Sequence, residues 1–240
     1  MILSSLRLGT STIIRHNARR TISTVRLVES TGPRSLALPL CFVHLKGYES
    51  SYASTTEWIS KFSEKGYSSL IVEIDPDTIT NKLKSTQQQQ QVLSSLEQEF
   101  ISTLSSCSES YSSPFPPLLF SSGPLSSYLT QSYVSSNPLS GLVLSKPLPL
   151  DLAPQKFPNL FFNNKTDGNE LKEFDFEPFF PVAVITSGEG GEGEGEEFRL
   201  IRDLKGYEEE EEGFVRRIRE GESDLETWEK IMDWMDENGL

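Results

Sequence analysis

The sequence predicts an α/β fold, in which a mostly parallel central sheet carries helices on both faces. Short apolar runs of strand length alternate with amphipathic helical segments between residues 40 and 144. Parallel neighbours need a crossover connection, usually a helix, so this alternation is typical of parallel sheets. The run at residues 40–44 is continuously apolar up to His44, which is typical of a buried strand. A chain of 240 residues is long enough for one such domain.

The expected elements follow one another in a regular order. Trp58, Ile59 and Phe62 lie at helical spacing, and Gly66 follows them as a C-cap would. Residues 147–180 are rich in Pro, Asn and Phe without a period, and we expect an irregular insertion there. The pattern predicts strands at residues 25–28, 35–38, 40–44, 69–74, 117–120, 140–144, 180–186 and 198–201, and helices at 54–65, 86–106, 124–134 and 228–235.

Residues 1–28 have the composition of a mitochondrial presequence. They contain five arginines and many hydroxyl side chains, and no acidic residue. A basic amphipathic helix is drawn inward by a negative-inside membrane potential. The composition therefore predicts import into the mitochondrial matrix, cleavage between about residues 20 and 30, and a mature domain at residues 29–240. The alternative is an ordinary basic N-terminal tail.

Charge and composition exclude several classes of function. The formal net charge is −13, and removal of the five leader arginines takes it to about −18, which disfavours nucleic acid as a partner. No apolar run approaches the ~20 residues of a transmembrane helix, so we expect a soluble or peripheral protein. Cys41 and Cys107 lack metal-ligand spacing and the chain has only two histidines, so we expect neither a metal nor another cofactor.

Two acidic segments, residues 187–197 and 207–213, are expected to be solvated loops. The first is rich in Gly and Glu but lacks the basic residue and the strand-to-helix setting of a phosphate-binding loop. The second contains five consecutive glutamates, from Glu208 to Glu212. The alternative for the second segment is contact with a basic protein surface or loose binding of divalent cations.

Two neighbouring segments carry the clearest resemblance to a known family: residues 119–133 read LFSSGPLSSYLTQSY, and residues 137–144 read NPLSGLVL. The first resembles the nucleophile-bearing strand and following helix of the α/β-hydrolase family, and the second resembles its next strand. Residues 42–48 resemble its oxyanion loop, and residues 182–189 its acid-bearing strand end. The resemblance covers about residues 38–240. It implies an α/β-hydrolase-like fold in which residues 147–180 form a reduced cap.

The nucleophile position depends on how the family's strand-to-helix turn is matched. One register places Pro124 there, which has no hydroxyl and cannot adopt the strained turn. The other register places Ser122 there, with Phe120 and Pro124 in flanking positions that should be small. An N-cap before a proline at the first helical position explains Ser122 at less cost, and we favour that interpretation.

The resemblance also requires a base and an acid. The family's base is a histidine after the last strand, but this sequence has none after residue 44. His44 is therefore the candidate base, or else a residue that braces the oxyanion loop. Glu189 is the candidate acid, with Glu192 and Asp203 as alternatives. A carboxylate alone does not replace a missing imidazole.

These gaps favour a mitochondrial α/β-hydrolase-like pseudoenzyme that acts as a binding or assembly component. Its expected contacts are unidentified mitochondrial proteins or a small apolar ligand held by phenylalanines in the cap-like segment. The alternative is a serine esterase or acyl hydrolase that acts on esters, with Ser122 as nucleophile and a non-standard base. Enzymatic activity is thus left open at this stage.

Overall fold

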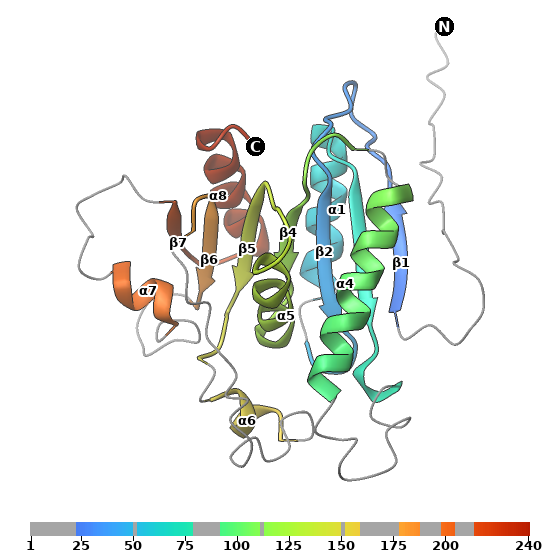
Figure 1. The fold of residues 1–240 in the computed structure, drawn as a ribbon. Helices are drawn as coiled ribbons and strands as arrows, with labels where there is room; N and C mark the ends of the chain where they lie inside the picture. The colour runs from blue at the N-terminus through green and yellow to red at the C-terminus, as the bar shows by residue number, and fades with distance from the viewer. Residues whose placement is uncertain are drawn as a thin grey trace, which may run out of the picture.

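The protein folds around one seven-stranded sheet with the strand order β1-β3-β2-β4-β5-β6-β7 (Figure 1). This computed structural model describes residues 23–49, 52–78, 92–110, 113–149, 152–158, 178–187, 198–204 and 214–240. The strands are β1 (Ser23–Val28), β2 (Leu40–Leu45), β3 (Ser69–Ile74), β4 (Leu118–Ser121), β5 (Gly141–Ser145), β6 (Val182–Thr186) and β7 (Val215–Arg219). Only β1 runs antiparallel to its neighbour, so the predicted mostly parallel sheet is confirmed.

Helices cover both faces of the sheet, as predicted. Figure 1 shows α4 (Val92–Ser110) and α5 (Pro124–Val134) on one face, and α1 (Tyr52–Lys65) and α8 (Asp224–Glu237) on the other. The short helices α6 (Ala153–Lys156) and α7 (Arg199–Leu204) follow β5 and β6. Each face has its own apolar core, and the strand residues alternate between the two cores.

The centre of the sheet is held in register by aromatic packing. All six residues of β2 are buried, and β2 pairs with β4 so that Phe42 lies beside Phe120 and Val43 beside Ser121. The rings of Phe42 and Phe120 stack with their centroids 4.6 Å apart, and Phe62 of α1 packs against both. A slip of one residue would turn these rings to the opposite face. The packing therefore fixes which residues lie side by side where β2 and β4 end.

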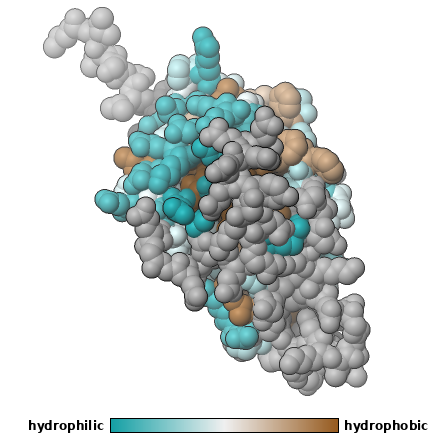
Figure 2. All heavy atoms as spheres, turned by 90° about the vertical axis from the view of Figure 1, so that its left-hand side faces the viewer, coloured by the Kyte–Doolittle hydropathy of each residue, from teal (hydrophilic) through white to brown (hydrophobic). Residues whose placement is uncertain are grey.

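Three expectations for local structure are wrong. Residues 35–38 do not form a strand, and residues 199–204 form helix α7 where a strand was expected at 198–201. Strand β7 was not predicted, because its sequence VRRIR is charged where a buried strand would be apolar. It lies at the edge of the sheet, where charged side chains are compatible with a strand and protect its open edge. The surface on this side shows a broad hydrophilic area (Figure 2).

Strand β1 contains the last six residues of the predicted presequence. Its residues Ser23–Val28 pair in register with β3, and Val25 and Leu27 pack against the core. Residues 1–22 lie outside the described part of the chain. Because β1 belongs to the sheet, we propose that any cleavage site precedes Ser23.

Removal of β1 is expected to destabilise the domain. The free energy of unfolding of a protein of residues 29–240 should be at least about 2 kcal/mol lower than that of residues 23–240. The shorter protein lacks the core contacts of Val25 and Leu27, and β3 becomes an open edge. Urea unfolding of both proteins measures the difference, with the full chain as control. Equal midpoints for the two shortened proteins would show that β1 does not stabilise the domain.

Candidate active site

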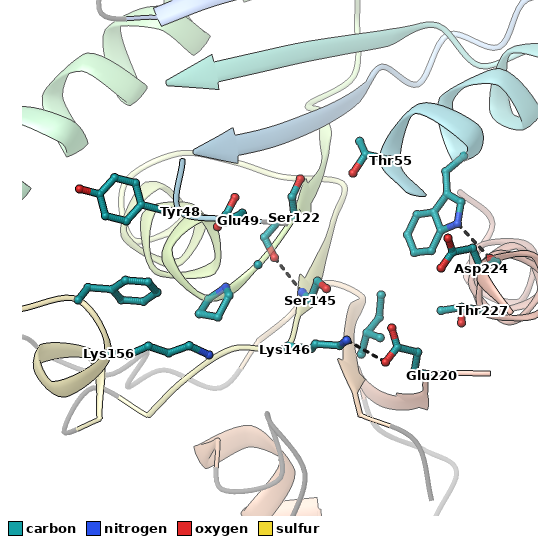
Figure 3. A pocket seen from close by; sticks show the side chains of 16 residues that line it. Tyr48, Glu49, Thr55, Ser122, Ser145, Lys146, Lys156, Glu220, Asp224 and Thr227 are labelled. Carbon is teal, nitrogen blue, oxygen red and sulfur yellow. Dashed lines mark hydrogen bonds and ion pairs between the residues drawn. The ribbon is translucent and has the colours of Figure 1, made fainter. Parts of the chain in front are cut away.

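The candidate site lies where the parallel strands end. The carboxyl ends of β2 to β7 meet at one edge of the sheet, which is where α/β proteins commonly bind ligands. A cavity of about 290 Å³ opens there. Its wall includes Glu49 from the turn after β2, Ser122 from the turn after β4, Lys146 after β5 and Glu220 after β7 (Figure 3). Residues of α1 and α8 close the opposite side.

Ser122 lies in the turn between β4 and α5, and its side chain is almost fully buried. Its N–H and its hydroxyl both donate to the carbonyl of Val43, at 3.1 and 2.8 Å. The N-cap of α5 is Gly123, not Ser122, and its φ of 176° is ordinary extended backbone. Among the described residues, the only non-glycine with positive φ is Lys146. Ser122 therefore lacks the strained backbone of the family's nucleophile turn.

His44 lies next to Ser122 at the end of the neighbouring strand. Because Val43 pairs with Ser121, His44 and Ser122 come next in the same register, with backbones about 4.8 Å apart. Both follow by two residues the stacked pair Phe42 and Phe120, so their side chains leave the same face of the sheet. Burial lowers the pKa of His44, partly opposed by the charge of Glu73, and the imidazole is neutral at pH 7.

Glu49 is the buried residue of this site that the sequence did not reveal. Its side chain is fully buried, and it accepts hydrogen bonds from the amides of Leu45 at 2.9 Å and Ser126 at 2.7 Å. Burial raises its pKa to about 6, although these amides oppose the shift. Its Oε2 atom lies 3.7 Å from Nδ1 of His44, beyond ordinary hydrogen-bond length. Because the imidazole is neutral, this contact is not an ion pair at pH 7.

A four-residue turn after β2 brings the side chain of Glu49 back to the end of that strand. The amide of Tyr48 donates to the carbonyl of Leu45, and Gly47 adopts a φ of 80° at the third position, which favours glycine. The carboxylate then fits against Gly123, where an added Cβ would lie 3.0 Å from Cγ and 3.1 Å from Oε1 of Glu49. Gly47 is typical of a turn at this position, but nothing in the local sequence indicates this distant contact.

An ion pair forms another wall of the cavity. The ammonium of Lys146 lies 2.8 Å from Oε2 of Glu220, which links the end of β5 to the end of β7 (Figure 3). Lys146 has a φ of 48°, an uncommon conformation for a residue with a side chain. Such conformations are concentrated at functional sites, where surrounding contacts hold them.

The remaining candidates are described only in part. Glu189 and Glu192 lie outside the described residues, and so do the acidic segments apart from Ser187. In the cap-like segment, Phe157 is buried and lines the cavity with its ring 6.2 Å from that of Tyr48, whereas Phe179 is 84% exposed. Cys41 is buried in the core. The described residues contain no helix suited to span a membrane and no cluster of metal-ligating side chains.

Comparison with solved structures identifies the fold. Esterase 2 of Thermogutta terrifontis, solved phosphoramylated by tabun, has a TM-score of 0.58 at 10% identity over 98% of this chain and 96% of its own. A thermostable carboxyl esterase from Bacillus coagulans gives 0.59 at 13% identity, over 96% and 99% of the two chains. Dienelactone hydrolase from Anabaena variabilis gives 0.58 at 11% identity, over 96% and 98%. The chain has an α/β-hydrolase-like fold.

The comparisons also correct the expected function. No protein-family model matches the sequence, and no curated protein matches it. The solved structures that share the fold are esterases and hydrolases, and this finding overturns the expectation of a non-catalytic binding or assembly component. It favours the alternative of a serine ester hydrolase. At 9–13% identity the likeness itself extends to the fold alone, so the activity has to be argued from the site.

The substitution Gly123→Ala is expected to destabilise the protein by about 1–3 kcal/mol, because the new methyl group overpacks the Glu49 side chain. The extended backbone at this position is not strained by a side chain. The same substitution in a Glu49→Ala background should cost much less, and urea unfolding of the four proteins forms the cycle that measures the coupling. Equal costs in both backgrounds would contradict the contact.

Glu49 should also make stability depend on pH. Its folded pKa of about 6 lies above its ordinary value of 4.5, so the folded state binds the proton more tightly. The resulting stabilisation is fully present below pH 4.5 and is lost as pH rises through 6, by about 2 kcal/mol. The stability of the wild type relative to Glu49→Gln should therefore fall by about this amount between pH 4 and 7. A difference independent of pH would show that Glu49 titrates normally.

Proposed function

We propose that the protein hydrolyses carboxylic esters, with Ser122 as the nucleophile and His44 as the general base. The observation that carries this proposal is the register of β2 and β4, which brings these two residues side by side at the carboxyl edge of the sheet. Ser122 lines the cavity there, so a bound ester would meet its hydroxyl. The esterases and hydrolases that share the fold support the same class of reaction.

In the first half of the reaction, the Ser122 hydroxyl turns away from the carbonyl of Val43 and gives its proton to His44. The Oγ atom attacks the ester carbonyl carbon and forms a tetrahedral intermediate. His44 then donates the proton to the leaving alkoxide, and an acyl group remains on Ser122. In the second half, His44 takes a proton from water, the hydroxide attacks the acyl carbon, and the acid is released as Ser122 regains its proton.

The state of His44 suits this role. Its lowered pKa keeps the imidazole neutral at pH 7, so it can accept a proton. The base thus comes from the end of a central strand, where the family resemblance implied a loop after the last strand. This difference accounts for the absence of any histidine after residue 44.

The oxyanion of the intermediate would be stabilised at the start of α5. The amide of Gly123, which directly follows the nucleophile, donates to the hydroxyl of Ser126 at 3.0 Å in the free protein. A rotatable hydroxyl can be exchanged for a developing oxyanion, which is a stronger acceptor because it is charged.

The size of the cavity indicates the size of the substrate. A volume of about 290 Å³ lies at the lower end of the range for small-molecule sites, and Trp58, Pro124 and Phe157 contribute apolar surface to it. We propose esters with a short acyl chain. The composition of residues 1–28 supports the mitochondrial matrix as the site of action.

Reaction with a fluorophosphonate probe tests the proposal. The wild type should be labelled and should hydrolyse p-nitrophenyl acetate, whereas Ser122→Ala should lose both properties. His44→Gln should keep Ser122 but lower the rate of both reactions at least about 100-fold. Ser121→Ala and His16→Gln are matched controls, because the Ser121 hydroxyl is bonded to Ser127 of α5 and His16 lies in the predicted presequence. Labelling that persists in Ser122→Ala, or its absence in a folded wild type, would refute the proposal.

A further inference from the structure

We infer that Glu49 is the carboxylate that positions His44, so that Ser122, His44 and Glu49 act together. This inference rests on the proposed function. It assigns the third role to a residue of the turn after β2, in place of the expected acid Glu189. Glu49 is a positioning residue because it acts on the nucleophile only through the imidazole.

Glu49 is held in one place by contacts from two different elements. The amide of Leu45, at the end of β2, donates to Oε2, and the amide of Ser126, in the first turn of α5, donates to Oε1. The side chain is fully buried, so water does not compete for these contacts. A carboxylate that is fixed at both oxygens can orient a neighbouring ring.

The carboxylate faces the ring nitrogen that would need orientation. Oε2 lies 3.7 Å from Nδ1 of His44. A carboxylate on this side favours the proton on Nδ1 and leaves Nε2 as the acceptor for the Ser122 hydroxyl. Contacts between catalytic groups are often long in free enzymes and shorten when substrate is bound. When Nε2 takes the proton, the ring becomes a positively charged imidazolium. The nearby carboxylate of Glu49 stabilises that charge.

Gly123 supports the same arrangement. Its missing side chain leaves the space that the Glu49 carboxyl group fills between the turn after β2 and the start of α5. A residue with a Cβ would push the carboxylate away from Leu45 and Ser126. The small residue next to Ser122 therefore serves the acid, whereas small residues in the family's turn serve the nucleophile.

Other titratable groups surround the pair. They are Glu73 on β3, Tyr48 in the turn, and Lys146, Lys156, Glu220 and Asp224 around the cavity. Lys146 is bound to Glu220, and Glu73 acts on His44 through its charge. Glu73 is therefore the matched control. Its charge raises the pKa of His44, and it pairs with His44 from the neighbouring strand β3, whereas Glu49 lies in the turn after β2.

The first test is the position of the imidazole proton in the full-length protein. The His16→Gln variant contains His44 as its sole histidine, so ¹⁵N NMR of labelled histidine reports this ring alone. At pH 7 we expect a neutral ring with the proton on Nδ1. Glu49→Gln should shift the population toward Nε2–H and lower the pKa of His44. Glu73→Gln should lower that pKa but leave the proton on Nδ1. A wild-type ring with its proton on Nε2 would overturn the inference, and this result needs no Glu49 variant.

The second test is kinetic. Glu49→Gln should lower kcat for p-nitrophenyl acetate on the order of 10²- to 10⁴-fold while KM changes little, because the substrate contacts remain. Glu73→Gln should retain kcat within about threefold. If hydrolysis depends on Ser122 but Glu49→Gln retains kcat, the role of Glu49 is wrong and the proposed function stands. If the folded wild type neither hydrolyses the ester nor reacts with the probe, the proposed function fails on its own.

Discussion

The carboxyl edge of the sheet depends on one buried carboxylate, that of Glu49. Taking an ionised carboxyl group out of water is costly, and the rise of its pKa to about 6 reflects that cost. Backbone amides of β2 and α5 offset much of it, because charge-assisted hydrogen bonds are stronger than neutral ones. The start of α5 adds its dipole. The same group therefore fixes the turn after β2, the position of α5 and the surroundings of His44.

The register of β2 and β4 is the second constraint, and it comes from packing. Phe42, Phe62 and Phe120 form one aromatic cluster between the sheet and α1. Shifting either strand would separate these rings and expose large apolar surface, so the register is strongly specified. His44 and Ser122 follow the cluster directly on their strands. The polar pair is thus aligned by apolar residues that take no part in any chemistry.

The fold could be predicted from the sequence where local pattern and final environment agree. Strands β2, β3, β4, β5 and β6 are short apolar runs, and their central places in the sheet match that pattern. Strand β7 and helix α7 were missed because an edge strand tolerates arginines and because FRLI suits either structure. Ser122 was interpreted as an N-cap, but the cap falls on Gly123, one residue later.

The candidate site was less predictable, because its decisive contacts join residues far apart in the chain. His44 and Ser122 were both recognised as candidates, but their adjacency depends on a strand pairing across 78 positions of sequence. No local pattern marks Glu49 as a buried residue. Its burial depends on Ser126 and on the space beside Gly123, and neither is visible in a local pattern.

The absence of strain at Ser122 has a consequence for how such a site would work. A nucleophile on a strained turn has its hydroxyl exposed before substrate arrives, and the stability of the fold compensates for the strain energy of that turn. Here the hydroxyl rests on the carbonyl of Val43, and breaking that hydrogen bond costs on the order of 1 kcal/mol. That is less than a tenfold penalty on the rate. The larger requirement is a base that is correctly oriented, so the catalytic capacity of this arrangement depends more on how firmly His44 is held than on the geometry of the serine itself.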